Sequence, residues 1–235
     1  MVCLPTYNER ENLEAMVSAL GEVLPEGSRI LVIDDSSPDG TGEIANRLAL
    51  KRDNVDVLHR PRKEGLGPAY LAGFRRALEL GADLVLEMDC DFSHDPKDVP
   101  RLVAASEQAD LVLGSRYVAS GGTRNWGFLR RAISRGGSLY AQILLGLPIR
   151  DLTGGFKCYR RAVLEAIDLD SIRSKGYAFQ IETTYRAIRA GFRVVEVPIV
   201  FVDREVGGSK MSRSIVLEAI WKVPALRLSR LRARA

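Results

Sequence analysis

The sequence predicts an α/β fold: a doubly wound, mostly parallel sheet flanked by helices, with a C-terminal amphipathic helix. Within the first 117 residues, five short apolar stretches typical of strands alternate with segments of helical periodicity. Polar residues follow several of these stretches directly. That order is typical of parallel βαβ units, which bind ligands at the carboxyl ends of their strands.

The N-terminal half supplies the elements of this sheet in order. The segment 11–24 carries apolar residues at helical spacing, and acidic residues are enriched in its first turns, as the helix dipole favours. Strands are expected at 1–4, 29–34, 55–58, from Leu84 onwards and at 111–114. Helices are expected at 11–24, 42–52, 68–80 and 96–109.

The C-terminal half is predicted to contain helices at 130–145 and 176–190, strands at 157–159 and 193–197, and a polar loop at 201–211. The first of these helices begins with Arg130, Arg131 and Arg135, although positive charge at a helix N-terminus is not favoured by the dipole. The arginines therefore indicate either a bound anion or a solvated surface. We expect a catalytic domain at 1–208 and a basic tail at 209–235.

The stretch from Leu84 to His94 is the strongest chemical signal, because its apolar run ends at Asp89 and Asp91. Residues two apart share one face of an extended chain, and two carboxylates suit Mg²⁺ or Mn²⁺, which complete their shells with water and substrate phosphates. The alternative is that both aspartates only shape a turn. His94 is predicted either to approach the metal or to make a turn hydrogen bond.

Composition and missing motifs narrow the function. Three cysteines without a C-x-x-C pair or a secretory leader favour a reducing cytoplasm, and no apolar stretch approaches the length of a membrane helix. There is no Gly-rich dinucleotide motif, P-loop or nucleophile elbow, and two histidines are few for a zinc site. Without a Gly-rich phosphate loop, the phosphates of a nucleotide substrate would be held by a metal bound to aspartates and by arginines.

Five ordered motifs, PTYNERENL, IDDSSPDGT, EMDCDFSH, GSRY and GGSKMS, resemble those of the dolichyl- or polyprenyl-phosphate mannosyltransferases. These are inverting glycosyltransferases of family 2 with the GT-A fold, and the resemblance covers residues 1 to about 225. It implies transfer of mannose from GDP-mannose to a dolichyl or polyprenyl monophosphate, with a divalent metal and release of GDP. It also implies contact with a membrane, either with its surface directly or through a membrane-protein partner.

The resemblance also implies roles for individual residues. The nucleoside pocket would be lined by Pro5, Tyr7, Glu9, Ile33 and Asp35, and the metal, diphosphate and sugar would be held by Asp89, Cys90 and Asp91. Arg116 and Arg130 correspond to arginines at the transferring centre and the acceptor phosphate, which makes them catalytic candidates with Asp91. Further donor contacts are implied for Ser93, which stands where some relatives have Gln, and for Gln180, Arg204 and Lys210.

The tail from Ser214 to Leu231 is amphipathic and basic, with Pro224 expected to kink it. It is predicted either to lie on anionic lipid at the cytoplasmic face of a membrane or to pack on the catalytic domain. Three other functions are compatible with parts of the sequence. The first is a glycosyltransferase of the same fold that uses UDP-glucose as donor or a glycan as acceptor. The others are a module that binds nucleic acid through the basic tail, and a nucleotidyltransferase. We expect no nucleic-acid partner, because that function leaves the acidic strand ends unexplained.

Overall fold

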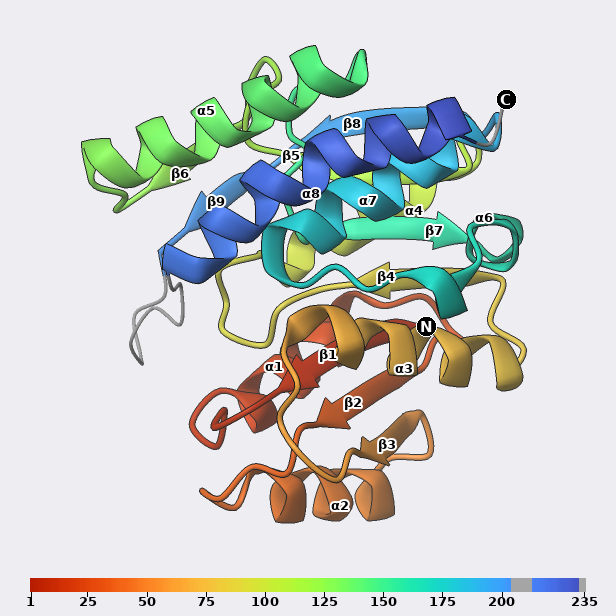
Figure 1. Cartoon of the computed structure of the whole chain (residues 1–235). Helices are drawn as coiled ribbons and strands as arrows, with labels where there is room; N and C mark the ends of the chain where they lie inside the picture. The colour runs from red at the N-terminus through yellow and green to blue at the C-terminus, as the bar shows by residue number, and fades with distance from the viewer. Residues whose placement is uncertain (204–212, 233–235) are drawn as a thin grey trace.

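The computed structural model describes residues 1–203 and 213–232, together with most of their side chains. A seven-stranded sheet in the order β3-β2-β1-β4-β7-β5-β8 runs through the molecule (Figure 1). Its strands are β1 (Val2–Thr6), β2 (Ile30–Asp34), β3 (Val55–His59), β4 (Leu84–Glu87), β5 (Leu111–Ser115), β7 (Lys157–Arg160) and β8 (Val194–Pro198). The doubly wound α/β fold is therefore confirmed.

One strand departs from the parallel arrangement. β7 lies between β4 and β5 and is antiparallel to both, whereas the other neighbouring strands are parallel. It places Lys157 directly opposite Glu87 of β4. The chain that leads into β7 thus crosses the carboxyl edge of the sheet, where β4 and β5 end.

Helices cover both faces of the sheet. Their bounds are α1 (Leu13–Val23), α2 (Thr41–Lys51), α3 (Leu66–Glu79), α4 (Val99–Ala105), α5 (Phe128–Leu145), α6 (Arg161–Ala166), α7 (Gly176–Arg189) and α8 (Arg213–Arg232). Buried residues of α1, α2 and α4 form one hydrophobic cluster, and those of α3, α6 and α7 belong to the other. Figure 1 shows α3 and α7 in front of the sheet, with α8 crossing in front of α7.

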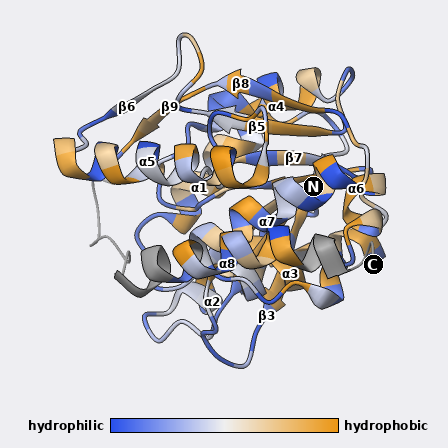
Figure 2. Ribbon diagram, turned by 45° about the horizontal axis from the view of Figure 1, so that its top comes forward, coloured by the Kyte–Doolittle hydropathy of each residue, from blue (hydrophilic) through white to orange (hydrophobic). Residues whose placement is uncertain are grey.

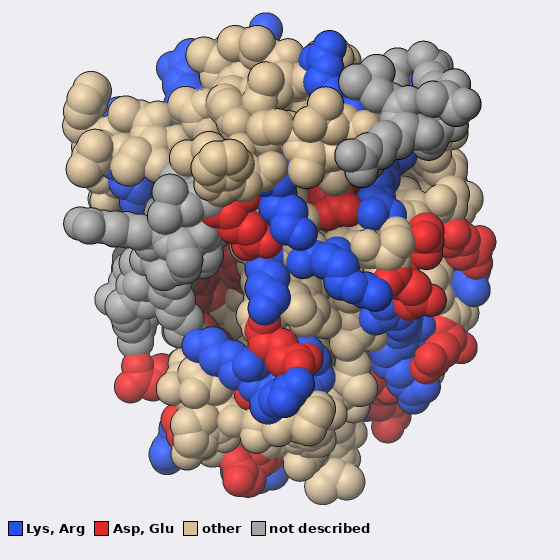
Figure 3. All heavy atoms as spheres, viewed as in Figure 1, with Lys and Arg blue, Asp and Glu red and all other residues tan. Residues whose placement is uncertain are grey.

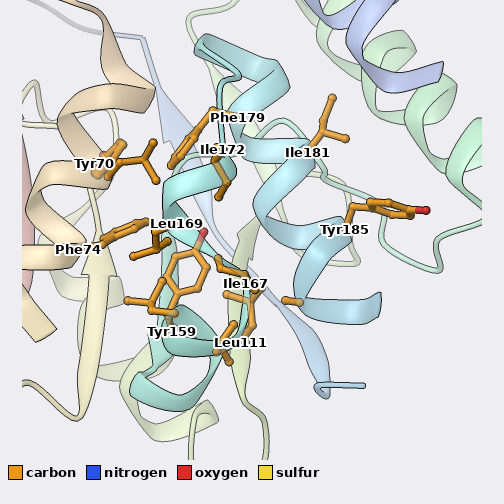
Figure 4. Packing of buried hydrophobic residues seen from close by; sticks show 14 of the residues in the cluster. Tyr70, Phe74, Leu111, Tyr159, Ile167, Leu169, Ile172, Phe179, Ile181 and Tyr185 are labelled. Carbon is orange, nitrogen blue, oxygen red and sulfur yellow. The ribbon is translucent and has the colours of Figure 1, made fainter. Parts of the chain in front are cut away.

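Alternation along the strands feeds both clusters, because successive side chains of a strand point to opposite faces. In β1, Val2 and Leu4 join the cluster with α1, whereas Cys3 joins the one with α3. Figure 2 shows the hydrophobic strands enclosed by helices of mixed hydropathy. In Figure 4, Phe74 of α3 and Tyr159 of β7 face one another; their ring centroids are 5.3 Å apart.

Several boundaries differ from those expected. The predicted helix 96–109 is a 3-10 turn, Pro96–Asp98, followed by a shorter α4. Val200–Val202 forms β9, which overlaps the start of the loop predicted at 201–211, and pairs with β6 (Gly122–Arg124), which was not predicted. Each of these strands has three residues and its partner lies far away in the chain, so neither carries a pattern of its own.

The C-terminal helix α8 packs against α5 and α7. The Tyr140 hydroxyl donates to the Ile220 carbonyl at 2.8 Å, and Val223 is fully buried. Of the two predictions for this segment, packing on the domain is therefore confirmed. Pro224 lies inside the helix, and the kink expected there stays a prediction. No helix in the described part of the chain is both long and apolar enough to cross a bilayer.

Candidate active site

A pocket of about 670 Å³ opens beyond the carboxyl ends of β1, β2, β4 and β5, with α3 and α7 at its sides. The predicted residues that line it are Pro5, Tyr7, Glu9, Asp35, Asp89, Cys90, Asp91, Arg116, Arg130 and Gln180. The sheet brings the residues that follow β1, β2, β4 and β5 to one rim, as the sequence predicted, and α5 and α7 add Arg130 and Gln180.

At the end of β1, the chain turns outward through Tyr7 to Glu9. Lys63, from the loop before α3, lies 3.8 Å from the centroid of the Tyr7 ring. The Glu9 backbone N–H donates to the Thr41 hydroxyl at 3.0 Å, and its carboxylate accepts from Asn12 at 2.9 Å. A flat aromatic ring with a cation above it and a fixed carboxylate nearby suits a nucleoside.

Asp35 follows β2 and forms a buried ion pair with Arg60. Burial raises the pKa of this carboxyl group, although the bond to Arg60 opposes the shift. Arg60 also bonds to Glu64 at 2.7 Å, so Asp35 is held from behind by a charged network. The neighbouring Ile33 lies in the hydrophobic core next to Gly73 and does not line the pocket.

β4 ends at Glu87, so Asp89 and Asp91 lie in the loop that follows rather than on the strand. Phe92 adopts a positive φ of 58°, and the turn that contains it keeps both aspartates in the pocket wall. The Tyr70 hydroxyl donates to Asp89 Oδ1 at 3.3 Å. The Ser93 backbone N–H donates to Asp91 Oδ1 at 3.0 Å, which gives Ser93 a supporting position outside the pocket lining.

His94 closes this loop. Its Nδ1 accepts the backbone N–H of Asp89 at 3.4 Å, and burial lowers its pKa to about 4. The imidazole is therefore neutral at pH 7 and can accept this bond. The predicted turn hydrogen bond is confirmed.

Arg116 follows β5 and is fixed by Asp151. The guanidinium donates from Nε at 2.7 Å and from Nη2 at 2.6 Å, and the Arg116 backbone N–H adds a third bond at 2.9 Å. Nη2 also bonds to the Thr153 hydroxyl at 2.9 Å. Nη1 makes no hydrogen bond within the described part of the chain, and Arg116 lines the pocket.

Arg130, in the first turn of α5, reaches the same pocket. Its Nη1 lies 2.7 Å from both carboxylate oxygens of Asp203, and each side chain of this pair is about a quarter exposed. Its buried Nε has no hydrogen-bond partner among the described residues. Trp126 lies against the guanidinium, with the ring centroid 4.4 Å from Cζ.

Gln180 of α7 forms part of the opposite wall. Its side-chain amide is buried next to the Glu87 carboxyl group, whose pKa it helps to lower. A Cβ on Gly155 would come within 3.1 Å of Gln180 Nε2, so glycine leaves room for that amide. Gln180 therefore belongs both to the pocket wall and to the buried polar groups around Glu87.

Two predicted donor contacts, Arg204 and Lys210, lie outside the described residues. Trp126 and Asp151 were not predicted. Asp151 precedes the paired glycines of DLTGG, and this acidic residue could have been considered as a counter-ion for Arg116. Trp126 directly follows a Gly- and Ser-rich segment and carried no recognisable signal.

The donor set at Asp89 and Asp91 fits a hard divalent cation, because both carboxylates line one pocket. No group of three His, Cys, Asp or Glu side chains arranged for a metal occurs in the described chain. Two carboxylates are nevertheless the usual protein contribution to a Mg²⁺ site that is completed by substrate phosphates and water.

Comparisons with known proteins all find glycosyltransferases. The family model described as glycosyl transferase family 2 matches residues 1–168. An undecaprenyl-phosphate mannosyltransferase of Micrococcus luteus is 52% identical over all of this chain and 98% of its own length. A polyprenol monophosphomannose synthase of Mycolicibacterium smegmatis is 52% identical, covering 95% of this chain and 84% of that protein.

Solved structures show the same fold at low identity. Glucosyl-3-phosphoglycerate synthase from Mycobacterium tuberculosis, in complex with phosphoglyceric acid, has a TM-score of 0.71 at 19% identity and covers 96% of this chain and 78% of its own. The same enzyme in complex with Mn²⁺, UDP and glucosyl-3-phosphoglycerate has a TM-score of 0.68 at 20% identity, covering 97% of this chain and 78% of its own.

The sheet order, the carboxylates at the strand ends and the arginines around one pocket define a glycosyltransferase of the GT-A fold. The chain belongs to glycosyl transferase family 2.

Proposed function

We propose that this chain transfers mannose from GDP-mannose to a polyprenyl or dolichyl monophosphate, with inversion at the sugar C1 and release of GDP. The identity of 52% to two enzymes named for mannose transfer to polyprenyl lipids, one of them over the whole chain, carries the proposal. The geometry of the pocket supports it, because each requirement of this reaction has a matching group.

The donor is held from its nucleoside to its sugar along one side of the pocket. Tyr7, Glu9 and Asp35 would receive the base and ribose, since carboxylates accept hydrogen bonds from base and ribose donors. Asp89, Cys90 and Asp91 lie next to them and would receive the diphosphate and sugar. Gln180 would complete the donor site with its amide, and Arg204 and Lys210 are proposed to contact the donor as well.

Asp89 and Asp91 would hold Mg²⁺ or Mn²⁺. The bound cation would neutralise part of the negative charge on the diphosphate, which makes that group a better leaving group. The protein's own contribution is to fix the two carboxylates: Tyr70 and the backbone of Ser93 each donate a hydrogen bond to one of them.

The acceptor phosphate requires no general base. A phosphate monoester has a second pKa near 6 and is already anionic at pH 7, so its oxygen is ready to attack C1. The chain must instead hold two repelling phosphates close together. Arg116 and Arg130 both line the pocket and would offset that repulsion.

The surface beside these arginines suits a lipid. A second pocket of about 350 Å³ shares Thr153 and Tyr177 with the first. Its apolar lining comes from α5, α7 and α8: Ile133, Gly136, Gly137, Tyr140, Ile181 and Ile220. An apolar groove continuous with the phosphate site favours a polyprenyl acceptor over a glycan, whose hydroxyls would be left unpaired there.

The outer faces of α5 and α8 expose further large apolar side chains. Phe128 is 85% exposed, Ile143 is 69% exposed and Trp221 is 78% exposed. In Figure 3, few charged residues cover the upper part of the molecule, where Figure 1 draws α5. Exposed apolar patches of this kind mark interaction surfaces, and we propose peripheral binding at the cytoplasmic face of a membrane.

A transfer assay tests the proposal. The protein is mixed with Mg²⁺, a short-chain polyprenyl phosphate and either GDP-mannose or UDP-glucose, and the lipid-linked sugar is followed. We expect lipid-linked mannose from GDP-mannose alone. Transfer of glucose only would replace the proposed donor, and nucleotide release without a lipid product would replace the proposed acceptor.

A pair of variants locates the chemistry. Asp91→Ala is expected to abolish transfer, because it removes a carboxylate from the metal site. Asp53→Ala makes the same change at an exposed position outside the pocket and is expected to retain activity. Full activity of Asp91→Ala would remove that residue from the proposed site.

A further inference from the structure

Trp126 brings together the two arginines of the pocket. The Cζ atom of Arg130 lies 4.4 Å from the centroid of the Trp126 ring, and the Cζ atom of Arg116 lies 5.4 Å from it. Both distances are within the range of a cation–π contact. Arg116 comes from the end of β5 and Arg130 from the start of α5, so this one ring joins two elements.

A shared aromatic ring addresses an electrostatic problem. Two guanidinium groups that serve one phosphate must stay close before the phosphate arrives, and like charges at short range repel each other. The face of an indole ring carries partial negative charge, so it attracts both cations without competing as a full anion would. The ring can therefore stabilise the arginines and leave their N–H groups available.

The Trp126 ring is itself held in place. It is 7% exposed and packs edge-on against Phe201 of β9, with ring centroids 5.2 Å apart. Phe201 packs in turn against His94 at 5.1 Å, and His94 stacks on Phe156 at 4.9 Å. This row of rings connects the arginine pair to the loop that carries Asp89 and Asp91.

The two arginines differ in how firmly other residues hold them. Asp151 fixes Arg116 through three hydrogen bonds in the protein interior. Among the described residues, Arg130 pairs with Asp203, where both side chains are about a quarter exposed, and its buried Nε has no hydrogen-bond partner. Contact with Trp126 is therefore the main constraint that relates the position of Arg130 to that of Arg116.

We propose that Trp126 is a positioning residue for the acceptor phosphate: its ring sets the spacing of Arg116 and Arg130 so that both meet one phosphate monoester. This inference rests on the proposed function, because it assumes that the two arginines receive the acceptor. It assigns Trp126 no contact with the reacting atoms.

The test compares Trp126→Leu, which removes the aromatic ring, with Trp126→Phe, which keeps one. The probe is methyl phosphate, a phosphate monoester without a lipid tail, and its dissociation constant is measured by titration followed by NMR. Loss of two cation–π contacts is expected to weaken its binding about tenfold in Trp126→Leu. Trp126→Phe is expected to recover most of the affinity.

The kinetic consequence should be confined to the acceptor. In Trp126→Leu, the KM for a short-chain polyprenyl phosphate is expected to rise as methyl phosphate binding falls, while the KM for GDP-mannose stays within a factor of about two. A general structural defect would change both. Leu50→Ala, at an exposed position on α2, is expected to leave methyl phosphate binding unchanged.

A double-mutant cycle shows whether Trp126 acts through arginine. Its effect on methyl phosphate binding should be smaller in an Arg130→Ala background than in the wild type. Equal effects in both backgrounds, or unchanged phosphate binding in Trp126→Leu, would overturn the inference. Because methyl phosphate binding needs no transfer, it is measurable even if lipid-linked mannose does not form, so the two proposals fail separately.

Discussion

Lys157 Nζ lies 3.7 Å from Oε1 of Glu87, and neither side chain has any solvent exposure. The two residues are directly opposed in the antiparallel pairing of β7 with β4. Lys157 also donates to the Gln180 carbonyl at 2.8 Å and to the Thr183 hydroxyl at 3.3 Å. A buried ion pair thus connects the strand before the aspartate loop with the helix that carries Gln180.

This pair predicts a large loss of stability when one charge is removed. Burial raises the pKa of Glu87 to about 7 and lowers that of Lys157 to about 8, so each charge depends on the other. Lys157→Met leaves Glu87 in the protein interior without its counter-ion and is expected to cost about 3–5 kcal/mol, measured by urea unfolding. Adding Glu87→Gln should recover part of this loss, and a double variant less stable than Lys157→Met would contradict the argument.

The bond between Arg116 and Asp151 predicts a second effect, which depends on pH. Burial alone would raise the pKa of Asp151, but the charge and hydrogen bonds of Arg116 hold it below the ordinary value of 3.8. The carboxylate therefore stabilises the fold above about pH 4, and this contribution is lost as the pH falls through the lowered pKa. Asp151→Asn should cost about 3–5 kcal/mol at pH 7, because it leaves Arg116 without its counter-ion.

The control for this prediction is the pH dependence of the difference between the wild type and Asp151→Asn. The unfolding free energy of the wild type should exceed that of Asp151→Asn by the same amount at pH 7 as at pH 5. Below the ordinary pKa of an aspartate the gap should narrow, because the unfolded wild type binds a proton there that the folded protein does not yet bind. A gap that widens on acidification would show that Arg116 does not lower this pKa.

These two pairs show how far the sequence predicts the molecule. The alternation of apolar strands and helices predicts the parallel part of the sheet, because each element carries its own periodicity. It could not predict that Lys157 faces Glu87, since β7 enters the sheet antiparallel from a distant segment. Ile33 shows the same limit: it is adjacent to two aspartates at a strand end, yet the pleat turns its side chain into the core.

The candidate site was predictable where motifs could be matched, as at Asp89, Asp91, Arg116 and Arg130. Residues that act through tertiary contacts were not. Trp126 and Asp151 gain their importance only because folding brings them against Arg116. A buried counter-ion or a shared aromatic ring has no fixed spacing along the chain, so only the structure identifies it.

Removing the charge of Asp203 is expected to improve acceptor binding, whereas removing a charge from either buried pair lowers stability. Its bond to Arg130 is partly exposed, and exposed ion pairs are weak, so a phosphate dianion can replace the carboxylate at little cost. Asp203→Asn removes this internal competitor and is expected to lower the KM for polyprenyl phosphate about two- to fivefold. Asp203→Glu keeps the charge and should resemble the wild type. A higher KM in Asp203→Asn would mean that Asp203 orients Arg130 instead.

The apolar surface of α5 and α8 predicts reversible binding to membranes. Removing the tail would be a poor test, because α8 packs on α5 and α7 through Tyr140 and the buried Val223. Point changes at exposed positions leave that packing intact, and Trp221 and Leu228 are both more than half exposed. Trp221→Asp with Leu228→Asp should reduce co-sedimentation with anionic liposomes, since burying a charged side chain in the acyl region is costly.

A matched control shows whether the effect depends on the position of the substitution or only on replacing an exposed apolar residue with a charged one. Leu50 is 88% exposed on α2, whose buried residues belong to a different hydrophobic cluster from that of α8, so Leu50→Asp should leave co-sedimentation unchanged. Activity towards a water-soluble short-chain acceptor should survive in all these variants, because the substituted residues lie outside the catalytic pocket. Equal liposome binding by the wild type and the α8 variant would place the membrane contact on α5, where Phe128→Asp and Ile143→Asp repeat the test.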